Sequence, residues 1–234
     1  MRDRYFTKYA VAAVRGFLKR NGRCDELPSE LMECELDVLT DGEYEQVLET
    51  AISRGVKIYN FKRSHSTLPR VQAVLGFLRG IAFDSLLDVG SGRGVFLFPF
   101  LEEFSDVSVT CMDVLDKRVE TLTDIKNGGV DRLEVMKADV CQKPLASDSV
   151  DVVTLLEVLE HIPDVGSAIC SAVSMARKYV VVTVPSKKDD NPEHIHLLTK
   201  DRLTELFGEC GVTRLSFGGV PGHLFMIARI GDEE

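Results

Sequence analysis

The sequence of 234 residues predicts an α/β fold with seven strands in one mostly parallel sheet. From residue 85 onward, short apolar runs alternate with helical segments, which is the pattern of a parallel sheet with crossover helices. The last two apolar runs, 213–217 and 223–230, are joined by a glycine-rich link that is too short for a crossover helix. They are therefore expected to pair as an antiparallel terminal hairpin.

The N-terminal part is predicted to be helical, so that residues 1–80 form a cap and residues 81–234 the sheet domain. Residues 1–20 place apolar side chains on one face at helical spacing, and basic residues interrupt any leader-like apolar run. We expect this helix to pack on the rest of the chain or on a partner, and the second case would give a homodimer through the N-terminal helices. The cap would form a lid or one wall of a substrate site.

Two capping signals divide the cap into helices. Ser29 is expected to cap a helix that ends at Asp37. Thr40 and Glu43 have the spacing of a capping box, and the helix that they open would end at Gly55.

The sheet domain follows in regular order after a predicted helix over 68–78. Strands are predicted at 85–89, 107–113, 133–137, 150–156 and 179–184. Helices are expected between them near 95–104, 117–125 and 166–176. Thr199 is expected to cap a last helix, which Gly211 ends before the terminal hairpin begins.

The composition limits which partners the protein is expected to bind and in which compartment it is expected. The formal charge of −9 argues against nucleic-acid binding driven by net charge, and a basic group of Lys57, Lys62, Arg63 and Arg70 is interpreted as a solvated face. No apolar run approaches the ~20 residues that a membrane helix needs. The six cysteines contain no C-x-x-C pair, so we expect them to be reduced and the protein to be cytoplasmic.

The most informative segment is the glycine-rich stretch at 86–96, where a buried strand is expected to turn into a helix. Gly90, Gly92 and Gly94 let the turn bend and let a ligand approach the main chain without a Cβ in the way. Asp113 ends the next predicted strand and can accept hydrogen bonds from both hydroxyls of a ribose. Together these features predict a nucleoside-binding site.

The glycine spacing indicates which nucleoside. A dinucleotide-binding turn has the pattern G-x-G-x-x-G, and this chain has Val95 at the position of the third glycine. Its G-x-G-x-G turn, with Asp88 two residues before Gly90, resembles motif I of the class I S-adenosylmethionine (SAM) methyltransferases. The acid near the turn suits the ammonium group of that cofactor.

Two later segments carry the same resemblance. Residues 137–140, which include Asp139, resemble the segment that holds adenine, and residues 149–161 resemble the fourth strand and loop of the type 11 methyltransferases. The resemblance implies a Rossmann-like fold, SAM as the cofactor and transfer of a methyl group. The cofactor-binding residues that it implies are Asp88, Gly90, Ser91, Gly92, Gly94, Asp113, Val114, Asp139, Val140 and Glu157.

Candidate catalytic residues follow from the chemistry of methyl transfer. The leaving group is neutral, so catalysis can rest on positioning, and a base is needed only where the acceptor must lose a proton. Glu157 and His161, after the fourth strand, are the candidate catalytic residues, with His161 as the base. Glu160, His194 and His196 are expected to order the substrate loop, and no resident metal is expected.

Other interpretations stay open beside a methyltransferase with a small-molecule acceptor. The Glu-x-x-Glu-His pattern at 157–161, followed by a late histidine, resembles the small-RNA 3′-terminal 2′-O-methyltransferases, which hold a divalent metal with such residues. An RNA acceptor is therefore an alternative, and a SAM-binding scaffold protein is another. Asp148, Asp151 and His223 are expected to be structural.

Overall fold

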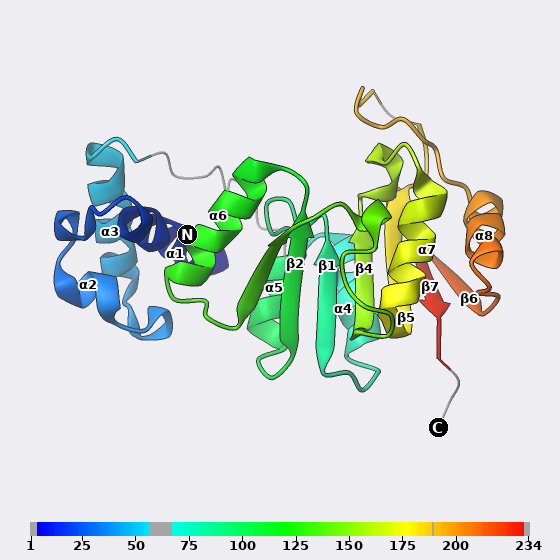
Figure 1. Ribbon diagram of the computed structural model, residues 1–234. Helices are drawn as coiled ribbons and strands as arrows, with labels where there is room; N and C mark the ends of the chain where they lie inside the picture. The colour runs from blue at the N-terminus through cyan, green and yellow to red at the C-terminus, as the bar shows by residue number, and fades with distance from the viewer. Residues whose placement is uncertain (1–3, 57–66, 189, 232–234) are drawn as a thin grey trace.

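The computed structural model describes residues 4–56, 67–188 and 190–231, which are arranged around one central sheet (Figure 1). The strand order is β3-β2-β1-β4-β5-β7-β6. Strands β1 to β5 are parallel, and β7 pairs antiparallel with both β5 and β6. This confirms the predicted Rossmann-like sheet with its terminal hairpin. The strands are β1 Ser85–Val89, β2 Ser108–Asp113, β3 Leu133–Lys137, β4 Val150–Leu156, β5 Ala176–Pro185, β6 Leu215–Val220 and β7 His223–Arg229.

Helices cover the sheet on both faces, and their ends differ from the predicted ends by a few residues. The α-helices are α1 Arg4–Arg20, α2 Ser29–Glu33, α3 Asp41–Ser53, α4 Pro69–Leu78, α5 Leu97–Glu103, α6 Asp116–Asn127, α7 Val165–Met175 and α8 Lys200–Glu209. Short 3-10 helices are η1 Cys24–Glu26, η2 Leu36–Val38, η3 Val140–Gln142 and η4 Leu159–His161.

Two hydrophobic cores separate the faces of the sheet. Leu86 of β1 belongs to the core shared with α4, α5, α6 and the N-terminal helices, whereas its neighbour Leu87 belongs to the core shared with α7 and α8. The alternation follows from the pleat of a strand, which points successive side chains to opposite faces. Figure 1 shows α7 in front of the sheet and α4 and α5 behind it.

The first helix packs within the chain, along α6 and α3 (Figure 1). An ideal Cβ on Gly16 would lie 1.8 Å from the main-chain oxygen of Asp124, and one on Gly128 would lie 1.8 Å from the oxygen of Ala12. The two helices therefore touch backbone to backbone, and only glycine fits at these crossings. The first helix therefore packs on its own chain, which is one of the two predicted arrangements.

The capping predictions have mixed outcomes. Thr40 and Glu43 form the predicted capping box, and Gly55 follows the end of α3 with a φ of +74°. The prediction for Ser29 is wrong, because Pro28 occupies the N-cap position and Ser29 is the first residue of the short helix α2. After α2 the chain turns into the separate 3-10 helix η2.

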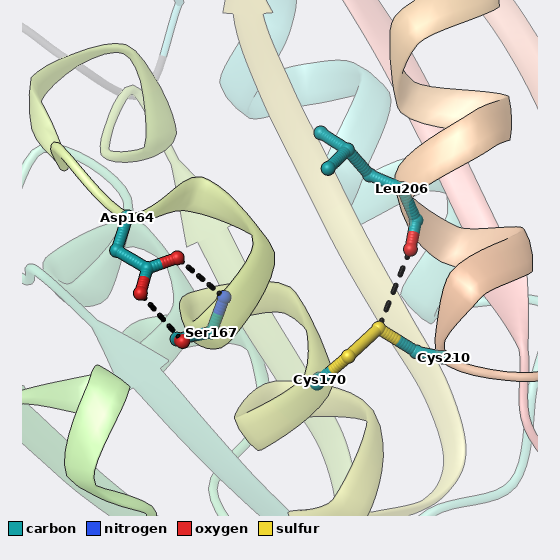
Figure 2. Close-up of a disulfide and its surroundings, with 5 residues drawn as sticks. All are labelled: Asp164, Ser167, Cys170, Leu206 and Cys210. Atoms are coloured by element: carbon teal, nitrogen blue, oxygen red, sulfur yellow. Dashed lines mark hydrogen bonds between the residues drawn. A yellow bond between two sulfur atoms is a disulfide. The ribbon is translucent and has the colours of Figure 1, made fainter.

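The prediction of reduced cysteines is wrong for one pair. Cys170 of α7 and Cys210 at the end of α8 form a disulfide, with their Cα atoms 5.2 Å apart (Figure 2). The two residues are 40 positions apart in the sequence, and the packing of two helices on the same face of the sheet brings them together. The other four cysteines are free thiols: Cys24, Cys34, Cys111 and Cys141.

Among the described residues, no helix is long and apolar enough to cross a membrane.

Candidate active site

The glycine turn after β1 has the backbone that its sequence predicts. Gly90, Gly92 and Gly94 have φ angles of +67°, +55° and +73°, in the left-handed region that favours glycine. A Cβ on Gly90 would lie 2.6 Å from a methyl carbon of Val158, and one on Gly94 would lie 2.4 Å from the ring of Phe98. The turn therefore has no room for side chains at these two positions.

Asp113 at the end of β2 holds this turn in place. Its Oδ2 atom accepts a hydrogen bond from the Gly92 N–H at 3.2 Å, and its Oδ1 atom accepts one from the Leu115 N–H at 2.9 Å. Each carboxylate oxygen has a second lone pair, so both oxygens can still accept a bond from a ligand. The Gly90 N–H adds a bond of 2.7 Å to the Met112 oxygen, which joins the turn to β2.

A cavity of about 460 Å³ lies beside the turn and contains several predicted cofactor residues. Asp113 and the exposed side chain of Val114 line it at the end of β2. Asp139 lines it after β3, where its carboxylate accepts a hydrogen bond from the Cys141 N–H at 2.9 Å. Other lining residues include Gly90, Gly92, Leu115, Arg118, Val140, Glu157, His161 and Glu193.

A smaller cavity of about 160 Å³ lies at the other end of the same turn. Asp88 and Ser91 line it, together with Arg70 and Val71 from the first turn of α4. The Thr154 hydroxyl donates a hydrogen bond of 2.7 Å to the buried Asp88 carboxyl group. Burial raises the pKa of Asp88 to about 6, because the charged form is poorly solvated there.

Glu157 lies where the two cavities meet, and together with Gly90 and Gly92 it lines both. Its φ angle is +58°, which is rare for a residue with a side chain. Its carboxylate accepts a hydrogen bond of 2.9 Å from the Thr183 hydroxyl and lies 2.9 Å from Nε2 of His223. Thr183 and His223 are thus functional candidates that the sequence did not indicate.

The loop after β4 also gathers three potential metal ligands. Glu160, His161 and His194 each offer one ligand atom, and these atoms lie within 4.8 Å of one another. The Ile195 N–H and the His196 N–H donate to the Glu160 main-chain oxygen at 2.9 and 3.3 Å, which fixes the segment that carries His194.

His196 of the predicted substrate group and the predicted catalytic residue Glu157 lie outside this set of three. His196 directs its Nε2 atom to the Ile162 oxygen at 3.0 Å, and Glu157 is held by Thr183 and His223. Neither belongs to the group of three potential ligands that the described residues contain.

The basic group near residue 60 contributes one residue to the site. Arg70, interpreted from sequence as part of a solvated face, is half-buried and lines the smaller cavity. Lys57, Lys62 and Arg63 lie outside the described residues. The described residues of α1 to α3 line neither of these two cavities, so within the described part of residues 1–80 it is α4 that reaches the site.

Known proteins match the central part of the chain. Residues 87–181 match a family model described as a methyltransferase domain. A probable SAM-dependent methyltransferase of Mycobacterium tuberculosis is 31% identical over 99 residues, which cover 38% of this chain and 36% of that protein. The 27-O-demethylrifamycin SV methyltransferase of Amycolatopsis mediterranei is 36% identical over 104 residues, covering 44% and 38%. The ubiquinone biosynthesis O-methyltransferase of Photobacterium profundum is 29% identical over 119 residues, covering 50% of each chain.

Solved structures share the fold, and the matches to curated relatives are partial. A SAM-dependent methyltransferase from Aquifex aeolicus superposes with a TM-score of 0.59 at 20% identity, covering 72% of this chain and 94% of that one. The match spans half or less of each curated relative named above. The matched domain, the sheet order and the glycine turn support the predicted resemblance to the class I SAM-dependent methyltransferases, with SAM as the cofactor.

Proposed function

We propose that the protein binds SAM across the two cavities and transfers its methyl group to a small-molecule acceptor. The observation that carries the proposal is that one glycine turn separates a larger cavity from a smaller one, and that acids line both. SAM likewise has two parts, an adenosine and an amino-acid tail, so that each part can occupy one cavity. At Gly92 an added Cβ would meet only the Gly90 oxygen, at 3.5 Å, so the missing side chain there lets the ligand pass close to the main chain.

The larger cavity suits the adenosine part. Asp113 has acceptor capacity left for the two ribose hydroxyls, and Asp139 has a carboxylate that can accept from the exocyclic amine of adenine. Val114, Leu115 and Val140 supply apolar contacts for the base.

The smaller cavity suits the amino-acid tail. Asp88 would face the ammonium group and Arg70 the carboxylate, so that each end of the zwitterion meets an opposite charge. Residues 81–234 with α4 would then form the catalytic unit, and α1 to α3 an added cap on α6.

SAM supplies the activated methyl group, and the side chains of the chain position the acceptor. His161 lines the larger cavity, and its Nδ1 atom lies 2.9 Å from the Glu193 oxygen. That contact favours the tautomer with a proton on Nδ1, which leaves Nε2 free to accept a proton from an acceptor hydroxyl. Glu157 would assist at the junction, and Glu160, His194 and His196 would order the loop over the acceptor. Two of the relatives are named for O-methylation, which supports a hydroxyl group as the acceptor.

Isothermal titration with SAM and S-adenosylhomocysteine (SAH) tests the cofactor site. We expect wild type to bind both, and Asp113→Ala to weaken both by about 100-fold, because two ribose hydroxyls lose their acceptors. Asp116→Ala is the matched control. Asp116 carries an exposed carboxylate three residues after Asp113 and is the first residue of α6. Equal binding by the Asp113 variant would contradict the proposal. A screen of phenols and catechols for SAH release then tests methyl transfer.

The group of Glu160, His161 and His194 favours a second candidate, a metal-assisted methyltransferase with an RNA ribose as the acceptor. One carboxylate and two imidazoles form a ligand set for Mn²⁺, Fe²⁺ or Zn²⁺. The contact from His161 Nδ1 to a main-chain oxygen is a common way to orient a metal-bound histidine. Titration with Mn²⁺ and a short RNA 3′ end tests this candidate. Loss of Mn²⁺ binding in His194→Ala but not in His196→Ala would support it, and absence of binding to wild type would exclude it.

The compartment stays a proposal as well. The expectation of a cytoplasmic protein rested on reduced cysteines, and the Cys170–Cys210 disulfide weighs against that argument.

A further inference from the structure

His223 contacts Glu157, and Glu157 lines both cavities where they meet. We propose that the Glu157–His223 pair sets the preference of the site for the cationic cofactor SAM over its neutral product SAH. The inference rests on the proposed function, because it assigns the junction of the two cavities to the sulfonium atom. His223 acts as a positioning residue, and Glu157 is the group that faces the ligand.

Glu157 is held at three points. Its N–H donates to the Thr183 main-chain oxygen at 2.9 Å, and its Oε1 atom accepts from the Thr183 hydroxyl at 2.9 Å. Its Oε2 atom lies 2.9 Å from Nε2 of His223. These contacts keep a residue with a side chain at a φ of +58°, so the carboxylate has a defined place at the junction.

Both nitrogens of the His223 ring face acceptors. Nε2 faces the Glu157 carboxylate, and Nδ1 lies 3.1 Å from the Pro221 oxygen. A main-chain carbonyl and an ionised carboxylate cannot donate, so the ring makes both hydrogen bonds only when each nitrogen carries a proton. A protonated ring compensates the charge of Glu157, and a neutral ring leaves that charge uncompensated.

The cofactor carries its positive sulfonium between the ribose and the amino-acid chain. With adenosine in the larger cavity and the tail in the smaller one, this atom lies beside the residues that line both cavities. These are Gly90, Gly92 and Glu157, of which only Glu157 has a charge. Its carboxylate attracts the sulfonium of SAM, whereas the thioether of SAH has no charge to attract.

Other charged groups surround the junction. Asp88, Arg70 and Arg93 line the smaller cavity, and Asp113, Arg118, Asp139, His161 and Glu193 line the larger one. The residues paired with His223 across the hairpin and the sheet, Val220 and Pro185, are uncharged. Among the described contacts of His223, the charged partner is therefore Glu157.

The test is the ratio of the two dissociation constants, Kd(SAH)/Kd(SAM), measured by titration calorimetry at one fixed pH. The ammonium, carboxylate and adenosine parts are common to both ligands, so groups that bind those parts cancel in the ratio. We expect wild type to bind SAM more tightly than SAH, because the Glu157 carboxylate attracts the sulfonium and not the thioether.

Four variants separate the roles. Glu157→Gln should lower the ratio about tenfold relative to wild type, because the carboxylate charge is gone. His223→Gln should give a higher ratio than His223→Lys, because the first has no charge and the second keeps a positive charge beside Glu157. Asp116→Asn, at an exposed carboxylate that lines neither cavity, should keep the wild-type ratio. Circular dichroism confirms that each variant is folded.

Two results overturn the proposal. A ratio in Glu157→Gln equal to that of wild type, or equal ratios in His223→Gln and His223→Lys, would show that the pair does not control the preference. Failure of wild type to bind either nucleoside would instead overturn the proposed function, and this inference with it.

Discussion

The Oδ2 atom of Asp113 accepts a hydrogen bond from the N–H of Gly92, 21 residues earlier in the chain. The acid that ends β2 thus fixes the turn that follows β1. This is possible because β1 and β2 are parallel neighbours whose carboxyl ends lie at the same edge of the sheet.

Asp113→Asn should weaken SAM binding by about tenfold, less than the alanine variant, since the amide keeps one acceptor oxygen. The amide nitrogen cannot accept from Gly92 or Leu115, so one of these two main-chain bonds is lost. Titration calorimetry measures the affinity, and Asp116→Asn serves as control. An affinity equal to that of wild type would contradict the role of both oxygens.

Asp88→Asn should remove a decrease in the free energy of unfolding that ionisation of Asp88 causes as the pH rises. The pKa of Asp88 is raised to about 6 in the folded protein, so the unfolded chain releases this proton first as pH rises from 4 to 6. Stability from this group is therefore highest below pH 4 and falls by about 3 kcal/mol up to pH 6. Urea unfolding of wild type and variant from pH 4 to 7 gives the difference. An identical pH slope in both proteins would refute the prediction.

SAM affinity should rise between pH 5 and 7, because the ammonium group favours the ionised form of Asp88. Asp88→Asn should bind SAM more weakly at pH 7 and show a smaller change over this range. Calorimetry with SAM and with 5′-methylthioadenosine, which lacks the amino-acid tail, checks the assignment. A similar pH dependence for both ligands would place the effect elsewhere in the site.

Cys170→Ser should lower the free energy of unfolding by about 3 to 4 kcal/mol, because the unfolded chain gains the freedom of a loop closed over 40 residues. Wild type in dithiothreitol should unfold at the same urea concentration as the variant. Cys24→Ser, at an exposed free cysteine, is the control and should match oxidised wild type. If the reducing agent has no effect on wild type, the disulfide contributes no stability.

Gly16→Ala should destabilise the protein by about 2 to 3 kcal/mol, because the new Cβ meets the main chain of Asp124 and separates α1 from α6. Gly42→Ala is the control: it lies in α3 with no atom within 4 Å of a Cβ, and should be neutral or stabilising. Thermal unfolding measures both. Equal melting temperatures for the two variants would show that α1 can shift without cost.

Local patterns in the sequence were sufficient to predict the sheet and the glycine turn after β1. Alternating apolar runs predicted the strands, and the length of the link before His223 predicted the antiparallel hairpin. Gly90 directly follows one predicted strand and Asp113 ends the next. A single sequence indicates both strands, and so it also indicates where these two residues lie. The capping box at Thr40 is local in the same sense, whereas Pro28 changed the start of the helix expected at Ser29.

Only the tertiary structure decided which distant side chains meet. The contact between Glu157 and His223 joins the end of β4 to the start of β7, and the Cys170–Cys210 bond joins two helices of one face. His194 approaches Glu160 through a loop whose course depends on main-chain hydrogen bonds to that residue. Such contacts carry no periodic signal, because they arise from packing between segments rather than from the repeat of a helix or a strand.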